Sequence, residues 1–147
     1  MKFRKFFIFS LVLLAAMAAL NFLAFKNFWY WRWPWFDQPM HFVGGLLVGL
    51  VAVQVFLFFG RRDHREIAGW DIALVSIAAA LLVGATWEWF EFTADQHLVA
   101  RVELKTLNMV YNGWAESLKD LVFDLSGGAT AAILFFISLI WQQKKAP

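Results

Sequence analysis

Cysteine is absent from the 147-residue sequence, and charged side chains make up only 16% of it. Without cysteine the chain can form neither disulfide bonds nor thiolate metal sites. The shortage of charge, with 61% hydrophobic residues and a mean hydropathy of +0.60, excludes an ordinary water-soluble domain. The net charge of +2 is too small to indicate a nucleic-acid partner. These values indicate a single integral membrane domain, residues 1–147, whose solvent is a lipid bilayer.

The charged residues collect in short clusters between four apolar runs of about 20 residues, the length that about 30 Å of hydrocarbon requires. The runs show no strand alternation, and a bilayer admits only helices or closed barrels. The first run resembles a signal peptide, but its apolar part is too long and lacks a clean small-residue cleavage site. The sequence therefore predicts an all-α fold, a four-helix transmembrane bundle, with spans at about 6–25, 40–59, 72–92 and 121–141.

Lysine and arginine are distributed unevenly over the segments between the runs. Eight fall on the side of the two termini, and five fall on the other side. The positive-inside rule then predicts a multi-pass protein of the bacterial cytoplasmic (inner) membrane with both termini in the cytoplasm. The first outer loop contains Trp29, Trp31, Trp33 and Trp35. These rings fit an aromatic belt at the headgroups, with a lipid-stacking platform as the alternative. In the second outer loop, the spacing of apolar residues over 96–109 is compatible with a short interfacial helix.

Acidic side chains stand at three ends of the runs that this topology brings to the outer surface. They are Asp37 before the second run, Glu88 and Glu91 at the end of the third, and Asp120 and Asp124 at the start of the fourth. Residues three or four apart share a helix face, which joins His41 to Asp37 and links the acids within each pair. Glycines four residues away continue these faces inward, so spans two, three and four are expected to pack together and span one to be peripheral. These glycines are Gly45, Gly84 and Gly128.

Carboxylates gathered in this way need compensation, because like charges repel one another when they are partly desolvated. Carboxylates with one imidazole suit a hard divalent ion, with Mg²⁺, Mn²⁺ or Ca²⁺ preferred over Zn²⁺ or Fe²⁺. The predicted ligands are Glu88, Glu91, Asp120, Asp124 and His41. The alternative is a hydrogen-bonded network that shares protons, in which Asp37 and Asp120 act as helix N-caps. Asp95 and His97 of the second outer loop are candidates to close over the site.

Three motifs carry a family resemblance: DQPMHFVGG, WEWFE and KDLVFDLSGGATAA occur in this order within residues 37–132. They resemble the small bacterial membrane proteins of the VanZ-like group and their YjdF-like relatives. The resemblance implies a compact helical bundle with a polar site at one membrane face, and the VanZ-like group is associated with glycopeptide resistance and the cell envelope. Ser126, Gly127 and Gly128 stand where an Asn often follows the last Asp in VanZ-like proteins. The resemblance is therefore closer to the YjdF-like side.

The depth of the acidic site favours a metal-dependent enzyme, a hydrolase or transferase, acting on an envelope lipid or lipid-linked polar group at the outer leaflet. In this interpretation His41, oriented by Asp37, is the catalytic residue that activates water or moves a proton. One alternative is a cation or proton transport protein that uses the same acids. Polar groups deeper in the spans are few, although an oligomer could supply more. Another alternative is a non-catalytic scaffold that binds a membrane partner through the aromatic loop.

Overall fold

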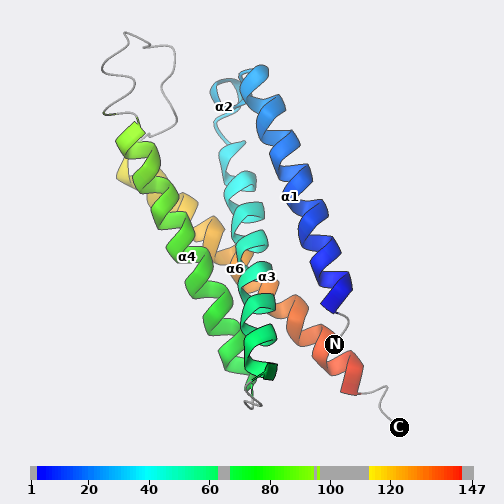
Figure 1. The fold of residues 1–147 in the computed structure, drawn as a ribbon. Helices are drawn as coiled ribbons and strands as arrows, with labels where there is room; N and C mark the ends of the chain where they lie inside the picture. The colour runs from blue at the N-terminus through cyan, green and yellow to red at the C-terminus, as the bar shows by residue number, and fades with distance from the viewer. Residues whose placement is uncertain (1–2, 63–66, 95, 97–112, 144–147) are drawn as a thin grey trace.

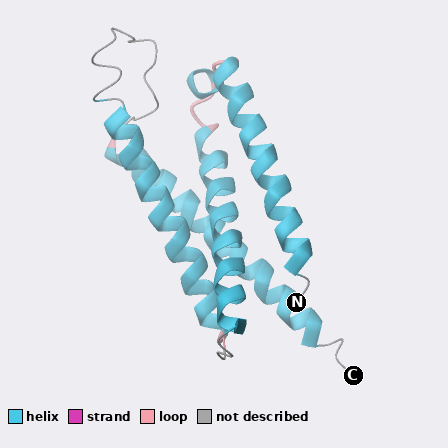
Figure 2. Cartoon of the chain, in the orientation of Figure 1, coloured by secondary structure: helices cyan, strands magenta, loops and turns pink. Residues whose placement is uncertain are grey.

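A computed structural model of the chain describes residues 3–62, 67–94, 96 and 113–143 (Figure 1). The described residues form helices α1 (Phe3–Lys26), α2 (Trp29–Arg32), α3 (Asp37–Arg62), α4 (Gly69–Ala94) and α6 (Trp114–Gln143). They contain no strand (Figure 2). Within this part of the chain, α1, α3, α4 and α6 are long and apolar enough to cross a membrane. The predicted all-α fold with four candidate membrane spans is therefore confirmed.

The helices place the acidic segments at one end of the bundle. Helix α1 begins and α6 ends at the lower end in Figure 1, where α3 also ends and α4 begins. The upper end holds α2, the first turns of α3 and α6, and the last turn of α4. Helix α6 runs obliquely behind α3 and α4 and packs against both. The up-and-down topology thus brings together the helix ends that carry the acidic side chains.

The spanning helices begin before the apolar runs that hydropathy predicts. Helix α3 begins at Asp37, α4 at Gly69 and α6 at Trp114, each before the predicted start of its apolar run. The difference is greatest at α6, because backbone hydrogen bonding continues through polar residues as readily as through apolar ones. Asp120 therefore lies inside α6, and its role as a helix N-cap in the proton-sharing alternative is wrong.

Glycines let α3, α4 and α6 approach one another closely. A Cβ atom on Gly127 would collide with the backbone of α3, and one on Gly84 would collide with the Asp124 carboxylate. Ser76 Oγ of α4 donates a 2.7 Å hydrogen bond to the carbonyl oxygen of Gly128. Contacts of this kind, with backbones nearly touching, are typical of small residues between membrane helices. The three helices therefore form a tightly packed unit, as predicted.

The apolar core lies between α3, α4 and α6, toward the end away from the acids. Its buried side chains are Leu50, Val53, Leu57, Ile72, Ala131 and Phe135. Such side chains gain dispersion contacts rather than hydrophobic burial when helices associate in lipid. This packing fixes how the helices are spaced at the acidic end.

Helix α1 is peripheral, as the sequence predicted. Among its described side chains, only Ser10 and Ala24 are buried. Gln54 Nε2 of α3 donates a 2.9 Å hydrogen bond to Ser10 Oγ, and the Phe6 ring stacks on Phe135 with centroids 4.3 Å apart. These contacts attach α1 to the bundle without bringing it into the acidic site.

Candidate metal centre

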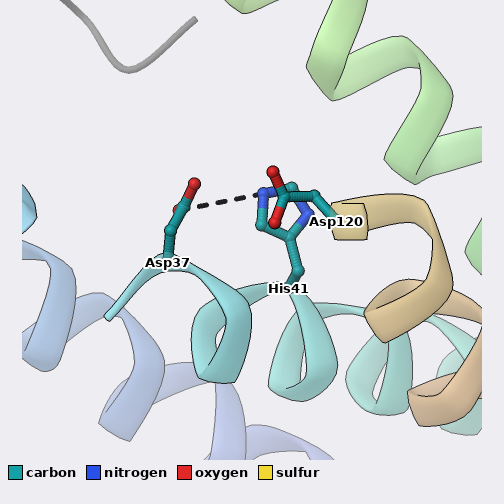
Figure 3. Close-up of side chains that lie close together, drawn as sticks. All are labelled: Asp37, His41 and Asp120. Carbon is teal, nitrogen blue, oxygen red and sulfur yellow. Dashed lines mark ion pairs between the residues drawn. The ribbon is translucent and has the colours of Figure 1, made fainter. Parts of the chain in front are cut away.

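Three buried side chains from two helices form a compact group at the upper end of the bundle. Asp37 is the first residue of α3, His41 follows it by one helical turn, and Asp120 comes from α6 (Figure 3). Each offers one ligand atom, and these atoms lie within 4.8 Å of one another. Two carboxylates and an imidazole at this spacing can hold a metal ion.

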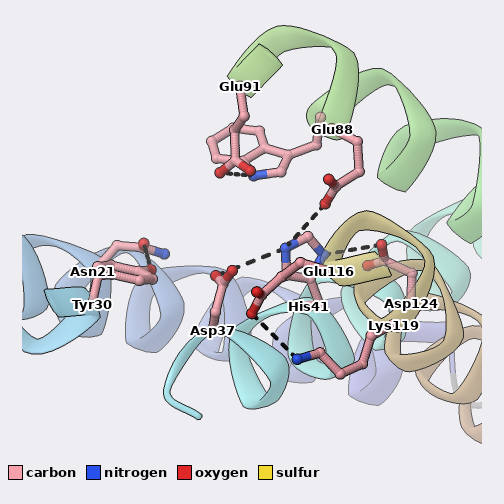
Figure 4. A network of polar contacts seen from close by, with 10 residues as sticks. Asn21, Tyr30, Asp37, His41, Glu88, Glu91, Glu116, Lys119 and Asp124 are labelled. Atoms are coloured by element: carbon pink, nitrogen blue, oxygen red, sulfur yellow. Dashed lines mark hydrogen bonds and ion pairs between the residues drawn. The ribbon is translucent and has the colours of Figure 1, made fainter. Parts of the chain in front are cut away.

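The imidazole of His41 is the centre of a wider set of contacts, which Figure 4 shows. Its Nδ1 lies 3.1 Å from Asp124 Oδ2, a hydrogen-bond distance. Its Nε2 lies 3.8 Å from Asp37 Oδ1 and 3.7 Å from Glu88 Oε1, which is too long for a hydrogen bond. A single buried ring thus meets carboxylates from α3, α4 and α6.

The hydrogen bond to Asp124 assigns different roles to the two ring nitrogens. The 3.1 Å distance allows the Nδ1–H group of His41 to donate to Asp124 Oδ2, because a carboxylate without a proton only accepts hydrogen bonds. Nε2 then either offers a lone pair, which suits a metal, or carries a second proton, which suits ion pairs with Asp37 and Glu88. Asp124 therefore orients the imidazole, whereas the sequence spacing suggests Asp37 for that role.

Two buried oxygens in this cluster lack partners. Among the described side chains, Glu88 Oε1 and Asp120 Oδ1 are buried without any hydrogen bond. An unsatisfied buried polar atom costs about 1–3 kcal/mol, and a charged one costs more. Buried acceptors are normally satisfied, so each of these oxygens is suited to a proton donor or a cation.

The neighbouring lysine does not supply this compensation. Lys119 Nζ pairs with Glu116 Oε1 at 3.3 Å, and the Lys119 side chain is 48% exposed. Asp120 Oδ1, on the next residue, stays without a partner. The balance of charge around His41 is therefore strongly negative unless a proton or a metal ion is bound.

Glu91, one of the predicted ligands, is turned toward its own helix. Its Oε1 accepts a 2.8 Å hydrogen bond from Trp87 Nε1, one turn earlier on α4. Glu91 is not a member of the compact group around His41, and its role as a ligand stays a prediction. The four-residue spacing of Trp87 and Glu91 would have indicated this bond from the sequence. Asp95, His97 and residues 97–109 of the expected interfacial helix lie outside the described residues.

Tyr30 of α2 is a neighbour of the acids that no motif or spacing in the sequence indicates. Its hydroxyl donates a 2.5 Å hydrogen bond to Asn21 Oδ1 of α1. Burial raises the pKa of Tyr30, and the negative charges of Asp37 and Glu91 raise it further.

A sharp turn at Phe28, whose φ of 57° is left-handed, redirects the chain between α1 and α2. Such a turn is difficult to predict from a phenylalanine.

An open pocket of about 420 Å³ lies next to the group formed by Asp37, His41 and Asp120. It is lined by Pro34, Trp35, Gln38, Glu116, Lys119 and Phe123. Gln38 and Lys119 are the sequence neighbours of Asp37 and Asp120, and Figure 4 draws Glu116 and Lys119 beside the His41 cluster. The site therefore has an approach from outside the bundle that contains aromatic, amide and charged side chains.

Comparison with known proteins gives a family match over nearly the whole chain. The model of the family described as "Predicted membrane protein (DUF2238)" matches residues 2–140. No curated protein and no solved structure matches the chain. These comparisons give no link to the VanZ-like or YjdF-like proteins, whose resemblance depends on three short motifs.

Proposed function

The chain belongs to the DUF2238 family of membrane proteins, and we propose that it is a metal-dependent membrane enzyme, a hydrolase or transferase. Its substrate would be an envelope lipid or a lipid-linked polar group. One observation carries the proposal: the buried His41 ring faces carboxylates from three helices, while Glu88 Oε1 and Asp120 Oδ1 have no hydrogen-bond partner among the described residues. Ionisable groups inside membrane helices are costly and mark functional sites.

The cluster divides into residues that would hold the ion and one that positions a ligand. Asp37, Asp120 and His41 through Nε2 would bind it, and Glu88 Oε1, 3.7 Å from Nε2, is placed to join them. Asp124 fixes the ring through Nδ1, as carboxylates do behind metal-binding histidines. Mostly oxygen ligands favour Mg²⁺, Mn²⁺ or Ca²⁺ over Zn²⁺ or Fe²⁺. The ion would act as a Lewis acid on a phosphoryl or carbonyl oxygen.

The aromatic loop supports a substrate at the level of the lipid headgroups. Trp35 lines the pocket together with Glu116 and stacks on Trp33, which in turn contacts Trp29. Indole rings prefer the interface between headgroups and acyl chains. The distribution of Lys and Arg supports placing this end at the outer leaflet of the bacterial inner membrane, with both termini in the cytoplasm. The polar bonds of an envelope lipid would then lie at the depth of His41.

Metal analysis tests the proposal directly. Protein purified in a mild detergent is expected to retain a stoichiometric divalent ion, which elemental analysis measures. Asp120→Asn should lose this ion because it removes a buried ligand. Asp71→Asn should keep it, because Asp71 is a buried carboxylate at the opposite end, where it accepts a hydrogen bond from the Ala68 backbone N–H. Retention of the ion by a correctly folded Asp120→Asn variant would contradict the proposed ligand set.

Reconstitution into liposomes separates the enzyme from its rivals. Headgroup turnover without ion flux would support an enzyme. Metal-coupled flux would indicate a transport protein instead. The described polar groups deeper in the bundle do not favour transport, because Ser76 and Gln54 are engaged in local hydrogen bonds. A scaffold would instead co-purify with a partner that survives mutation of the acids but not of Trp35.

A further inference from the structure

The pocket beside the metal-binding group has the chemistry of a particular headgroup. We propose that it binds the phosphoethanolamine headgroup of a zwitterionic phospholipid, with the phosphate on Lys119 and the primary ammonium on Glu116. This inference rests on the proposed function, because it names the substrate class of the same site. The pocket, of about 420 Å³, opens between the loop before α3 and the first turns of α3 and α6.

The charged wall of the pocket presents one cation and one anion side by side. Lys119 Nζ and Glu116 Oε1 are 3.3 Å apart, and their side chains are 48% and 22% exposed. An exposed ion pair of this kind contributes only about 0–1 kcal/mol. Exchanging it for contacts with a ligand that carries both charges therefore costs little. Gln38, which also lines the pocket, can donate to a phosphate oxygen or accept from an ammonium.

The surrounding charge favours a zwitterion over an anionic lipid. Glu116 lines the pocket and brings a carboxylate to it beside Lys119. This carboxylate repels a headgroup with a net negative charge and attracts an ammonium group. A primary ammonium also donates up to three hydrogen bonds, whereas a trimethylammonium group donates none. Phosphatidylethanolamine should therefore bind better than phosphatidylglycerol or phosphatidylcholine.

The remaining wall is aromatic and suits the less polar part of the lipid. Trp35 is 61% exposed and stacks on Trp33 with ring centroids 6.2 Å apart. Phe123 faces the pocket from α6. Amphipathic rings at this depth can pack against the glycerol and the first methylene groups while the headgroup contacts Lys119 and Glu116. The pocket thus has a polar and an apolar part, as the lipid does.

Native mass spectrometry of the full chain in detergent tests the inference. Phosphatidylethanolamine, phosphatidylglycerol and phosphatidylcholine with the same acyl chains are titrated, and the first is expected to bind tightest. Lys119→Gln and Glu116→Gln should each weaken its binding about tenfold, the effect of losing one hydrogen bond to a charged group. Lys26→Gln is the matched control, because Lys26 is an exposed lysine at the same end of the bundle but outside the pocket.

Equal binding of the three lipids, or an equal loss in Lys26→Gln, would overturn the inference. Elemental analysis of the same samples separates this result from failure of the proposed function. A wild-type protein that holds its ion without preferring phosphatidylethanolamine refutes the pocket assignment alone. A protein that prefers this lipid and holds no ion supports the headgroup pocket and refutes the metal enzyme. Loss of the lipid preference with retained metal in Lys119→Gln supports both.

Discussion

The middle level of the bundle and its acidic end both contain buried polar side chains, and these differ in how they are paired. In the middle, Ser76 donates to a carbonyl oxygen of α6, and Gln54 donates to Ser10 of α1. These groups are neutral, and each has a partner on another helix. At the acidic end most of the buried polar groups are ionisable, and Glu88 Oε1 and Asp120 Oδ1 have no hydrogen-bond partner among the described residues.

This difference distinguishes buried polar groups that hold helices together from buried polar groups that suggest a functional site. Neutral hydrogen bonds between membrane helices hold the helices together and need nothing further. A cluster of buried carboxylates around one imidazole is a poor way to stabilise a bundle, because desolvation costs more than the contacts return. The middle level can therefore be explained by packing alone, whereas the acidic end cannot. Its unpaired oxygens are explained when a cation is part of the site.

Removing the imidazole of His41 should have the largest effect on metal binding at the acidic end. His41→Ala deletes a proposed ligand and releases Asp124 from its hydrogen bond. We expect the affinity for Mn²⁺ to fall by more than about 100-fold, because losing even a partner behind a ligand costs about 10–100-fold. Isothermal titration calorimetry measures this loss. Gln54→Leu, at the middle level, is the control, and an unchanged affinity in His41→Ala would show that the ring is not a ligand.

Asp124→Asn tests whether this residue positions the ring or binds the ion itself. Asparagine can still accept the hydrogen bond from His41 Nδ1, but it lacks the charge that strengthens the imidazole as a ligand. The affinity for Mn²⁺ should therefore fall roughly tenfold. This is the lower end of the loss seen when a residue that hydrogen-bonds to a metal ligand is mutated. A loss as complete as that in Asp120→Asn would instead make Asp124 a ligand.

Gly127→Ala tests the close packing of α6 against α3. Its Cβ would collide with the α3 backbone, which cannot move aside, so the free energy of unfolding should fall by about 1–3 kcal/mol. Gly44→Ala is the matched control, because its Cβ would lie 3.4 Å from the mobile end of Met17. Reversible unfolding in mixed micelles compares the two variants. Equal stabilities would mean that α3 and α6 are not in backbone contact.

Gln54→Leu should have the smallest effect. It removes the hydrogen bond to Ser10, and such bonds between membrane helices contribute on average about 0.6 kcal/mol. The same unfolding assay should show a loss of that size or less, with metal content unchanged. Loss of metal in this variant would remove the distinction between the two levels and would favour a polar path through the bundle.

Much of the fold follows from the sequence, because hydropathy alone locates the four apolar runs. The helix starts do not, and α6 shows why. Hydropathy predicts a start at Leu121, but the helix begins at Trp114. A helix needs only continuous backbone hydrogen bonding, and the polar residues before Leu121 provide it as well as apolar ones do. Composition marks the part of a helix that lipid can cover rather than the whole helix.

The sequence predicted that acids gather around His41, but it did not predict which contacts they make. Topology and spacing were enough to bring His41 together with Glu88 and Asp124. They could not assign the hydrogen bond of the ring to Asp124 rather than Asp37, because that depends on the close approach of α3 and α6 and on side-chain rotamers. Glu91 shows the same difficulty, since helical spacing puts it near Glu88 but its carboxylate bonds to Trp87.

The glycine contacts described above have a consequence for which ions could be accepted. Where backbones already touch, as at Gly45 and Gly127, the walls around the carboxylates cannot move inward to meet a small cation. Mg²⁺ demands short, near-octahedral bonds, whereas Ca²⁺ tolerates longer and less regular ones. Walls of fixed spacing would select a bound ion by its radius, and enlarging a single glycine should then shift the preference among divalent ions before it abolishes binding.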